Sequence, residues 1–72
     1  MRRVLLYTDE EGNWIAEVLS LPGCGSEGKT REEALANVRE AIEVYIEALA
    51  QDGLSIPLEY DNYELVAVAA TA

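Results

Sequence analysis

Residues 30–53 of the chain read TREEALANVREAIEVYIEALAQDG, and this stretch decides the fold. It opens with a capping box, in which the Thr30 hydroxyl can accept the Glu33 amide while the Glu33 carboxylate reaches back to the Thr30 amide. Apolar side chains then recur every three or four positions from Ala34 to Leu49, as they do on one face of an amphipathic helix. Gly53 can adopt the left-handed conformation that ends a helix. The pattern predicts one long helix over about residues 31–52.

Strand-like segments lie on both sides of this helix. The sequence predicts strands over about residues 3–8, 14–19 and 24–28 before it, and a final strand over about residues 63–69 after it. Acidic and glycine-rich turns separate the first three strands. We therefore expect an α+β fold of one domain, residues 1–72, in which a three-stranded antiparallel meander precedes one long helix and a final strand. The helix should cover one face of the sheet.

Both faces of the outer predicted strands are apolar. Val4 and Leu6 alternate with Leu5 and Tyr7 in the first strand, and residues 65–68 are apolar throughout. A single helix covers only one face of a sheet, and large exposed apolar patches on small proteins mark interaction sites. We expect the uncovered face to bind a second copy of the chain, so that the protein is a homo-oligomer, or to bind a partner protein. A mixed, solvated face is the alternative.

The composition restricts the possible partners and chemistry. Fourteen acidic residues against five basic ones give a net charge of −9. Nucleic-acid binding needs Lys and Arg to neutralise phosphates, so we expect no direct contact with nucleic acid or with anionic membranes, whereas encounter with a basic protein is accelerated. Solubility is the simpler explanation of this charge.

The residue inventory also limits catalysis and metal binding. The chain has no histidine, and Cys24 is its single cysteine. Intramolecular disulfides, cysteine or histidine zinc sites, and Ser/His or Cys/His catalytic pairs are therefore excluded. The N-terminus lacks the apolar run of a signal peptide or membrane helix, which predicts a cytoplasmic protein.

Carboxylates cluster in and beside the first hairpin turn. Asp9, Glu10 and Glu11 lie in the turn, and Glu17 lies in the next strand. Such groups can hold a divalent metal or act as general acid and base, but acidic turns are more often solvated loops, and the spacing is not that of a calcium loop. We predict no catalytic, cofactor-binding or metal-binding residue. These four residues are instead our candidates for binding a partner.

The loop before the third strand contains the remaining candidates. Gly23, Gly25 and Gly28 only superficially match a phosphate-binding loop, because Pro22 and the weak preceding strand do not fit that motif. Turn geometry is the preferred explanation for these glycines. Cys24 is expected to be a small buried residue.

Several of these motifs together resemble a known family, the HicB-like antitoxins. The matching segments are Gly12–Val18, Leu21-Pro22-Gly23-Cys24, Gly28–Ala34, Ala41-Ile42 and Gly53–Pro57. The resemblance spans nearly the whole chain and implies a truncated ribonuclease-H-like fold of βββαβ order, without the acidic active site of ribonuclease H. It also implies that the partner is HicA, a small basic RNA-cleaving toxin. Many family members continue into a C-terminal DNA-binding segment, which we do not expect here.

Three hypotheses follow for function. The first is an antitoxin-type module, not an enzyme, which neutralises a basic HicA-like toxin. The second is an orphan homo-oligomeric module without a toxin. The third is a metal-dependent nuclease built on Asp9, Glu10, Glu11 and Glu17. A neighbouring reading frame for a short basic protein with a central histidine would distinguish the first from the second.

Overall fold

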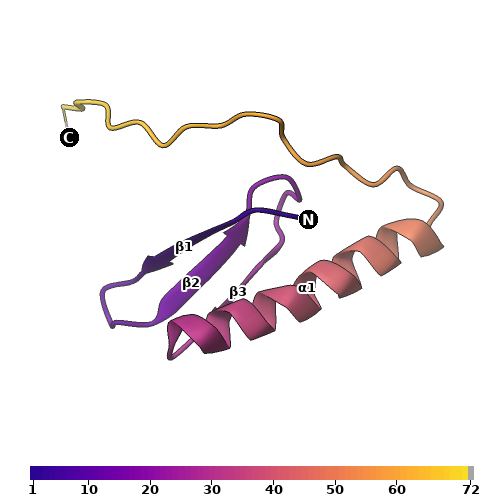
Figure 1. The fold of residues 1–72 in the computed structure, drawn as a ribbon, viewed down its shortest axis with the longest axis horizontal. Coiled ribbons are helices and arrows are strands. Elements are labelled where there is room, and N and C mark those ends of the chain that lie inside the picture. The colour runs from indigo at the N-terminus through magenta and orange to yellow at the C-terminus, as the bar shows by residue number, and fades with distance from the viewer. Residues whose placement is uncertain (72) are drawn as a thin grey trace.

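The computed structural model describes residues 1–71 and contains a three-stranded sheet followed by one long helix (Figure 1). The elements are β1 (Val4–Thr8), β2 (Trp14–Val18), β3 (Gly25–Gly28) and α1 (Arg31–Gln51). The sheet order is β1-β2-β3, and both pairings are antiparallel. The predicted α+β meander with one long helix is therefore confirmed, and the bounds of these four elements agree with the predicted ones to within one residue. Within these residues, no helix has the length and apolar character that crossing a bilayer needs.

The core lies between the helix and one face of the sheet. Val4 is opposite Val18 and Leu6 is opposite Ala16 in the β1–β2 ladder, so these side chains share the face that α1 covers. The buried apolar residues are Ala16, Val18, Leu21, Cys24, Ala34 and Val38. The helix packs chiefly on β3 and β2. β1 is an outer strand of the sheet, and within residues 1–71 no strand pairs with its second edge.

Local contacts fix both the start and the end of α1. The Glu33 amide donates to the Thr30 hydroxyl at 3.0 Å, as the capping box predicts. The Glu33 carboxylate, however, accepts from the Lys29 amide at 3.4 Å and not from the Thr30 amide, so the return contact lies one residue earlier than predicted. At the other end, Gly53 has a φ of 68°, and the Leu54 amide donates to the Leu49 carbonyl at 2.9 Å.

The predicted final strand is the main correction. Residues 63–69 are not a strand: they belong to an extended C-terminal tail, residues 54–71, which in the described chain pairs with no strand. Alternating or continuous apolar residues favour an extended backbone, but a strand also needs a neighbour that accepts its hydrogen bonds. The tail does not pair with the free edge of β1. The local sequence could not specify whether the tail would find a strand to pair with.

Part of the tail is nevertheless attached to the N-terminus. The Glu59 carboxylate accepts a hydrogen bond from the Arg3 amide, and this bond is the main reason why the pKa of Glu59 lies below its ordinary value of 4.5. The Arg3 guanidinium also lies over the Tyr63 ring, 5.3 Å from its centre, and Tyr63 meets the Tyr60 ring edge to face at 6.4 Å. Residues 59–63 are thus held beside the start of β1.

Removing the charge of Glu59 should loosen this attachment. A carboxyl whose pKa is lowered in the folded state contributes fully above its ordinary value of 4.5, and its contribution is lost as the pH falls through the lowered value. We expect faster amide exchange at Arg3 in Glu59→Gln than in the wild type at neutral pH, and a convergence of the two proteins at acidic pH. Hydrogen exchange followed by NMR measures both effects. Glu64→Gln is the matched control on the same tail, and equal exchange at Arg3 in Glu59→Gln and Glu64→Gln would contradict the assignment.

Candidate functional site

The sheet face opposite α1 is the candidate site, and we call it the open face. The β1–β2 and β2–β3 registers place five side chains on it: Leu5, Tyr7, Ile15, Glu17 and Glu27. Tyr7, Glu17 and Glu27 are exposed, and Leu5 and Ile15 are partly buried. In β1 itself, Leu5 and Tyr7 point away from the core that Val4 and Leu6 enter, as expected, but Glu17 and Glu27 make the open face as a whole mixed.

The charge of the open face has one sign. The strands β1, β2 and β3 contain two charged residues, Glu17 and Glu27, and both lie on this face. Glu17 lies opposite Leu5 and Glu27 lies opposite Ile15, so carboxylates and apolar side chains are neighbours on this face. A face of this kind complements a partner that presents an apolar centre and basic side chains.

A hydrogen bond orders the centre of the open face. The Tyr7 hydroxyl on β1 donates to the Glu17 carboxylate on β2 at 2.8 Å. This bond, more than desolvation and the nearby negative charge, raises the pKa of Tyr7 above its ordinary value of 10.0. Tyr7 therefore remains a neutral donor at physiological pH and holds the Glu17 carboxylate in one orientation.

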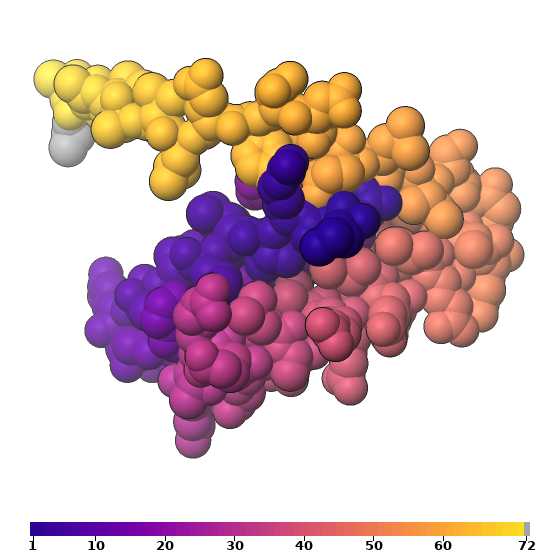
Figure 2. All heavy atoms as spheres, in the orientation of Figure 1, coloured from indigo at the N-terminus to yellow at the C-terminus, as the bar shows by residue number. Residues whose placement is uncertain are grey.

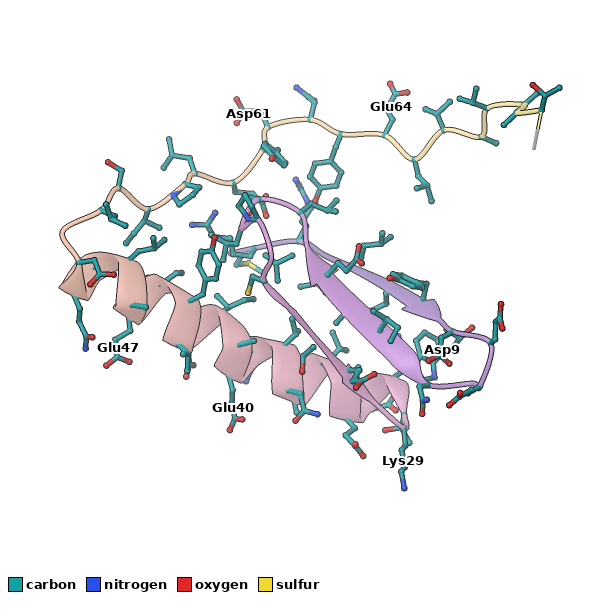
Figure 3. All side chains as sticks on the ribbon, turned by 180° about the vertical axis from the view of Figure 1, so that it is seen from behind. Asp9, Lys29, Glu40, Glu47, Asp61 and Glu64 are labelled. Carbon is teal, nitrogen blue, oxygen red and sulfur yellow. The ribbon has the colours of Figure 1, made fainter. Side chains whose placement is uncertain are left out.

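The acidic hairpin turn lies at one end of the open face, where Figure 3 labels Asp9. One Asp9 carboxylate oxygen accepts the amides of Glu11 and Asn13, both at 2.9 Å, while Gly12 has a φ of 84°. Asp9 therefore closes the turn. Glu10 and Glu11 are exposed.

The four predicted partner-binding residues thus occupy two places. Asp9, Glu10 and Glu11 are in the turn. Glu17 lies three residues beyond Trp14, the first residue of β2, and is therefore about 10 Å from the turn end of that strand at the usual rise. Among residues 1–71, no group of three or more acidic or cysteine side chains converges as a metal site. The nuclease hypothesis therefore has no geometric support in the described chain.

The glycine-rich loop before β3 has a packing role. Gly23 has a φ of 78°, which is the turn geometry that we expected. Gly25 and Gly28 instead lie within β3, where a Cβ on Gly25 would come to 2.8 Å from the Ala16 carbonyl oxygen. Close backbone contact, and not a turn, explains these two glycines.

Cys24 packs beside this loop as a buried residue. Its side chain is 7 % exposed, and burial raises the pKa of its thiol above the ordinary value of 9.0. The Tyr45 hydroxyl donates to the Pro22 carbonyl at 2.8 Å and fixes the loop against α1. The expectation of a small buried cysteine is confirmed, and its protonated thiol is a poor nucleophile.

Sequence reasoning missed Glu27 and the contact between Tyr7 and Glu17. Alternation along β1 placed Leu5 and Tyr7 together, but the partners across the sheet depend on register. Glu27 is opposite Ile15, and this pairing became visible only with the β2–β3 ladder. The contact between Tyr7 and Glu17 could have been predicted from the exact length of the first hairpin turn, because loop length fixes the register of a hairpin.

Comparison with known proteins gives one family across the chain. Residues 3–69 match the model of the HicB-like antitoxin of bacterial toxin–antitoxin systems. A UPF0150 protein of Thermoplasma acidophilum is 45 % identical over 67 residues, which cover 93 % of this chain and 94 % of that protein. A UPF0150 protein of Synechocystis is 45 % identical over 56 residues, covering 78 % of this chain and 71 % of the relative. An uncharacterised 14.9 kDa protein of Haemophilus phage HP1 is 39 % identical over 44 residues, covering 61 % of this chain and 33 % of the phage protein.

Proposed function

The chain belongs to the HicB-like antitoxin family, and from this membership we propose that it binds and neutralises a small, basic, HicA-like toxin that cleaves RNA. On this proposal the protein acts by binding and catalyses no reaction of its own. Its place of action is the cytoplasm, where such a toxin meets its RNA. The observation that carries the proposal is the open face, with its apolar side chains and its two glutamates.

The acidic turn extends this surface. The described turn and strands, residues 4–18 and 25–28, contain five carboxylates and no basic side chain: Asp9, Glu10, Glu11, Glu17 and Glu27. We propose that Leu5, Tyr7 and Ile15 contact the toxin directly and that the turn steers its approach. Rim charges change association rates more than final affinity, whereas a buried apolar centre sets the dissociation rate.

The steering role gives a kinetic prediction. Asp9 closes the turn, so the variant keeps it and changes its two exposed neighbours, Glu10→Gln/Glu11→Gln. We expect the association rate with a HicA-like protein from the same genome to fall roughly a few-fold at low salt, and the difference to shrink as salt screens the charges. Stopped-flow fluorescence at several salt concentrations measures both.

A matched control removes the same charge elsewhere. Glu40 and Glu47 project from α1 away from the sheet (Figure 3). Glu40→Gln/Glu47→Gln should therefore change the association rate less than the turn variant does. If both variants slow binding equally, net charge alone steers the encounter. If neither slows it at low salt, the toxin does not approach over the turn.

An orphan module that binds only itself is the second candidate. The observation that favours it is the C-terminal tail, where Leu65 is 90 % exposed and Val68 is 80 % exposed. Such apolar exposure suits self-association without any toxin. The neighbouring genes distinguish the two. If a short basic protein is encoded beside this gene and co-expression of the two rescues growth, the antitoxin is supported. The absence of such a gene supports the orphan.

A further inference from the structure

We propose that residues 66–69, which follow the part of the C-terminal tail that lies against its own chain, form the fourth strand of the sheet in a second copy of the chain, paired with the free edge of β1, so that two copies exchange tails. This inference does not rest on the proposed toxin, although the added strand would lie beside Leu5 and Tyr7 of the open face. It concerns how the protein associates with itself and which residues make the contact.

The first observation is that the tail leaves its own sheet. The contacts of Arg3 with Glu59 and Tyr63 hold the tail beside the start of β1. Leu65 then shares a hollow with Leu5 and Leu19, on the side of the open face. Beyond this point the tail stands clear of the body, as the yellow end of the chain shows in Figure 2. Val66 is 63 % exposed and Val68 is 80 % exposed.

The second observation is that β1 has an unoccupied edge. Its pairing with β2 uses one side of the strand, and the other side presents free N–H and C=O groups in the described chain. An unpaired edge of this kind is a template for another strand. Residues 66–69 of the tail, about 13 Å long when extended, fit within the five residues of β1, about 17 Å.

The third observation concerns what an added strand would cover. A groove runs between β1 and α1, lined by Val4, Leu35, Val38 and Ile42. A strand at the β1 edge would project alternate side chains over this groove and the others over the side of Leu5 and Tyr7. The apolar run from Leu65 to Ala69 has no polar face, which is typical of a strand covered on both sides.

The charge distribution identifies a second copy as the occupant. Two chains of net charge −9 repel each other over most of their surfaces. This repulsion is weakest at the proposed contact, because neither residues 4–8 nor residues 65–71 include a charged residue. Arg2 and Arg3 precede β1, whereas Asp61 and Glu64 precede the apolar run, so the flanking charges are complementary as well. Reciprocal exchange would occupy both tails and both edges, giving a closed two-fold dimer.

The test begins with mass. Light scattering at micromolar concentration should give about twice the 7.9 kDa of one chain. Val66→Pro/Ala67→Pro removes two neighbouring backbone donors, one of which must face the partner strand, and should return the mass of a monomer. Ala70→Pro/Thr71→Pro makes the same change just beyond the segment and should remain dimeric. A monomeric wild type, or a dimeric Val66→Pro/Ala67→Pro variant, would overturn the proposal.

Cross-linking then locates the contact. In a Cys24→Ser background, a Tyr7→Cys chain and an Ala67→Cys chain are mixed in urea, refolded together and treated with a short thiol cross-linker. We expect a product that joins the two kinds of chain, and little product when Leu58→Cys replaces Ala67→Cys. Cross-linking of Ala67→Cys to itself would mean that tails pair with tails. A chain with both cysteines, mixed at micromolar concentration with an excess of cysteine-free chains, that still closes on itself would mean that the tail returns to its own sheet. Either result would contradict the exchange.

Discussion

Leu21→Ala is expected to lower the free energy of unfolding by about 2–5 kcal/mol, the range for deleting a large aliphatic side chain from a core. Leu21 is 0 % exposed and is the largest fully buried side chain of the described residues. It lies in the loop between β2 and β3, where its carbonyl accepts the Cys24 amide at 2.9 Å. This backbone contact survives the substitution, so the loss measures the side chain. The free energy of unfolding of a native protein is about 5–15 kcal/mol, so this loss would be a large share of it.

Urea denaturation followed by far-UV circular dichroism, at one protein concentration, measures the loss. Leu58→Ala is the matched control, because Leu58 is 86 % exposed on the tail and its truncation should change stability by less than about 0.5 kcal/mol. Equal midpoints for the two variants would show that Leu21 is not part of the stabilising core.

Gly28→Ala should destabilise the fold by about 1–3 kcal/mol through overpacking. A Cβ at this position would lie 2.6 Å from the Ala34 amide nitrogen and 2.9 Å from the Glu33 carbonyl carbon. Both atoms belong to the backbone of the first turn of α1. No flexible side-chain end can move away, so the start of the helix must shift from β3.

Ser26→Ala is the control for this substitution, since Ser26 lies on the same strand and is partly buried. The same urea titration should give a clearly lower midpoint for Gly28→Ala than for Ser26→Ala. A Gly28→Ala protein as stable as the wild type would mean that α1 and β3 are not in close contact there.

The helix and the first three strands were predictable because their ends carry local chemical signals. Thr30 caps the helix and Gly53 ends it, and both act through contacts within a few residues. The hairpin turn at Asp9 is similar, because its carboxylate binds amides two and four positions along the chain. Contacts between residues so close in the chain can be predicted from a short stretch of sequence.

The final strand and the composition of the open face were not predictable in the same way. The apolar run at residues 65–68 specifies an extended backbone but not which edge accepts its hydrogen bonds. Glu27 joined the candidate site only through its pairing with Ile15 across the sheet. The partner-binding role of Asp9, Glu10, Glu11 and Glu17 stays a prediction, although the structure assigns Asp9 a closing role in the turn.

The order of the elements has a consequence for folding kinetics. Each strand pairs with its neighbour along the chain, and α1 packs mainly on the strand that precedes it, so the body is built from contacts of short sequence separation. Such topologies fold quickly, because little loop-closure entropy is lost before native contacts form. The bond between the Arg3 amide and Glu59 spans 56 positions and should form last. On refolding, therefore, the sheet and helix should be complete before the tail attaches, and the chain should pass through a state with a folded body and a free tail.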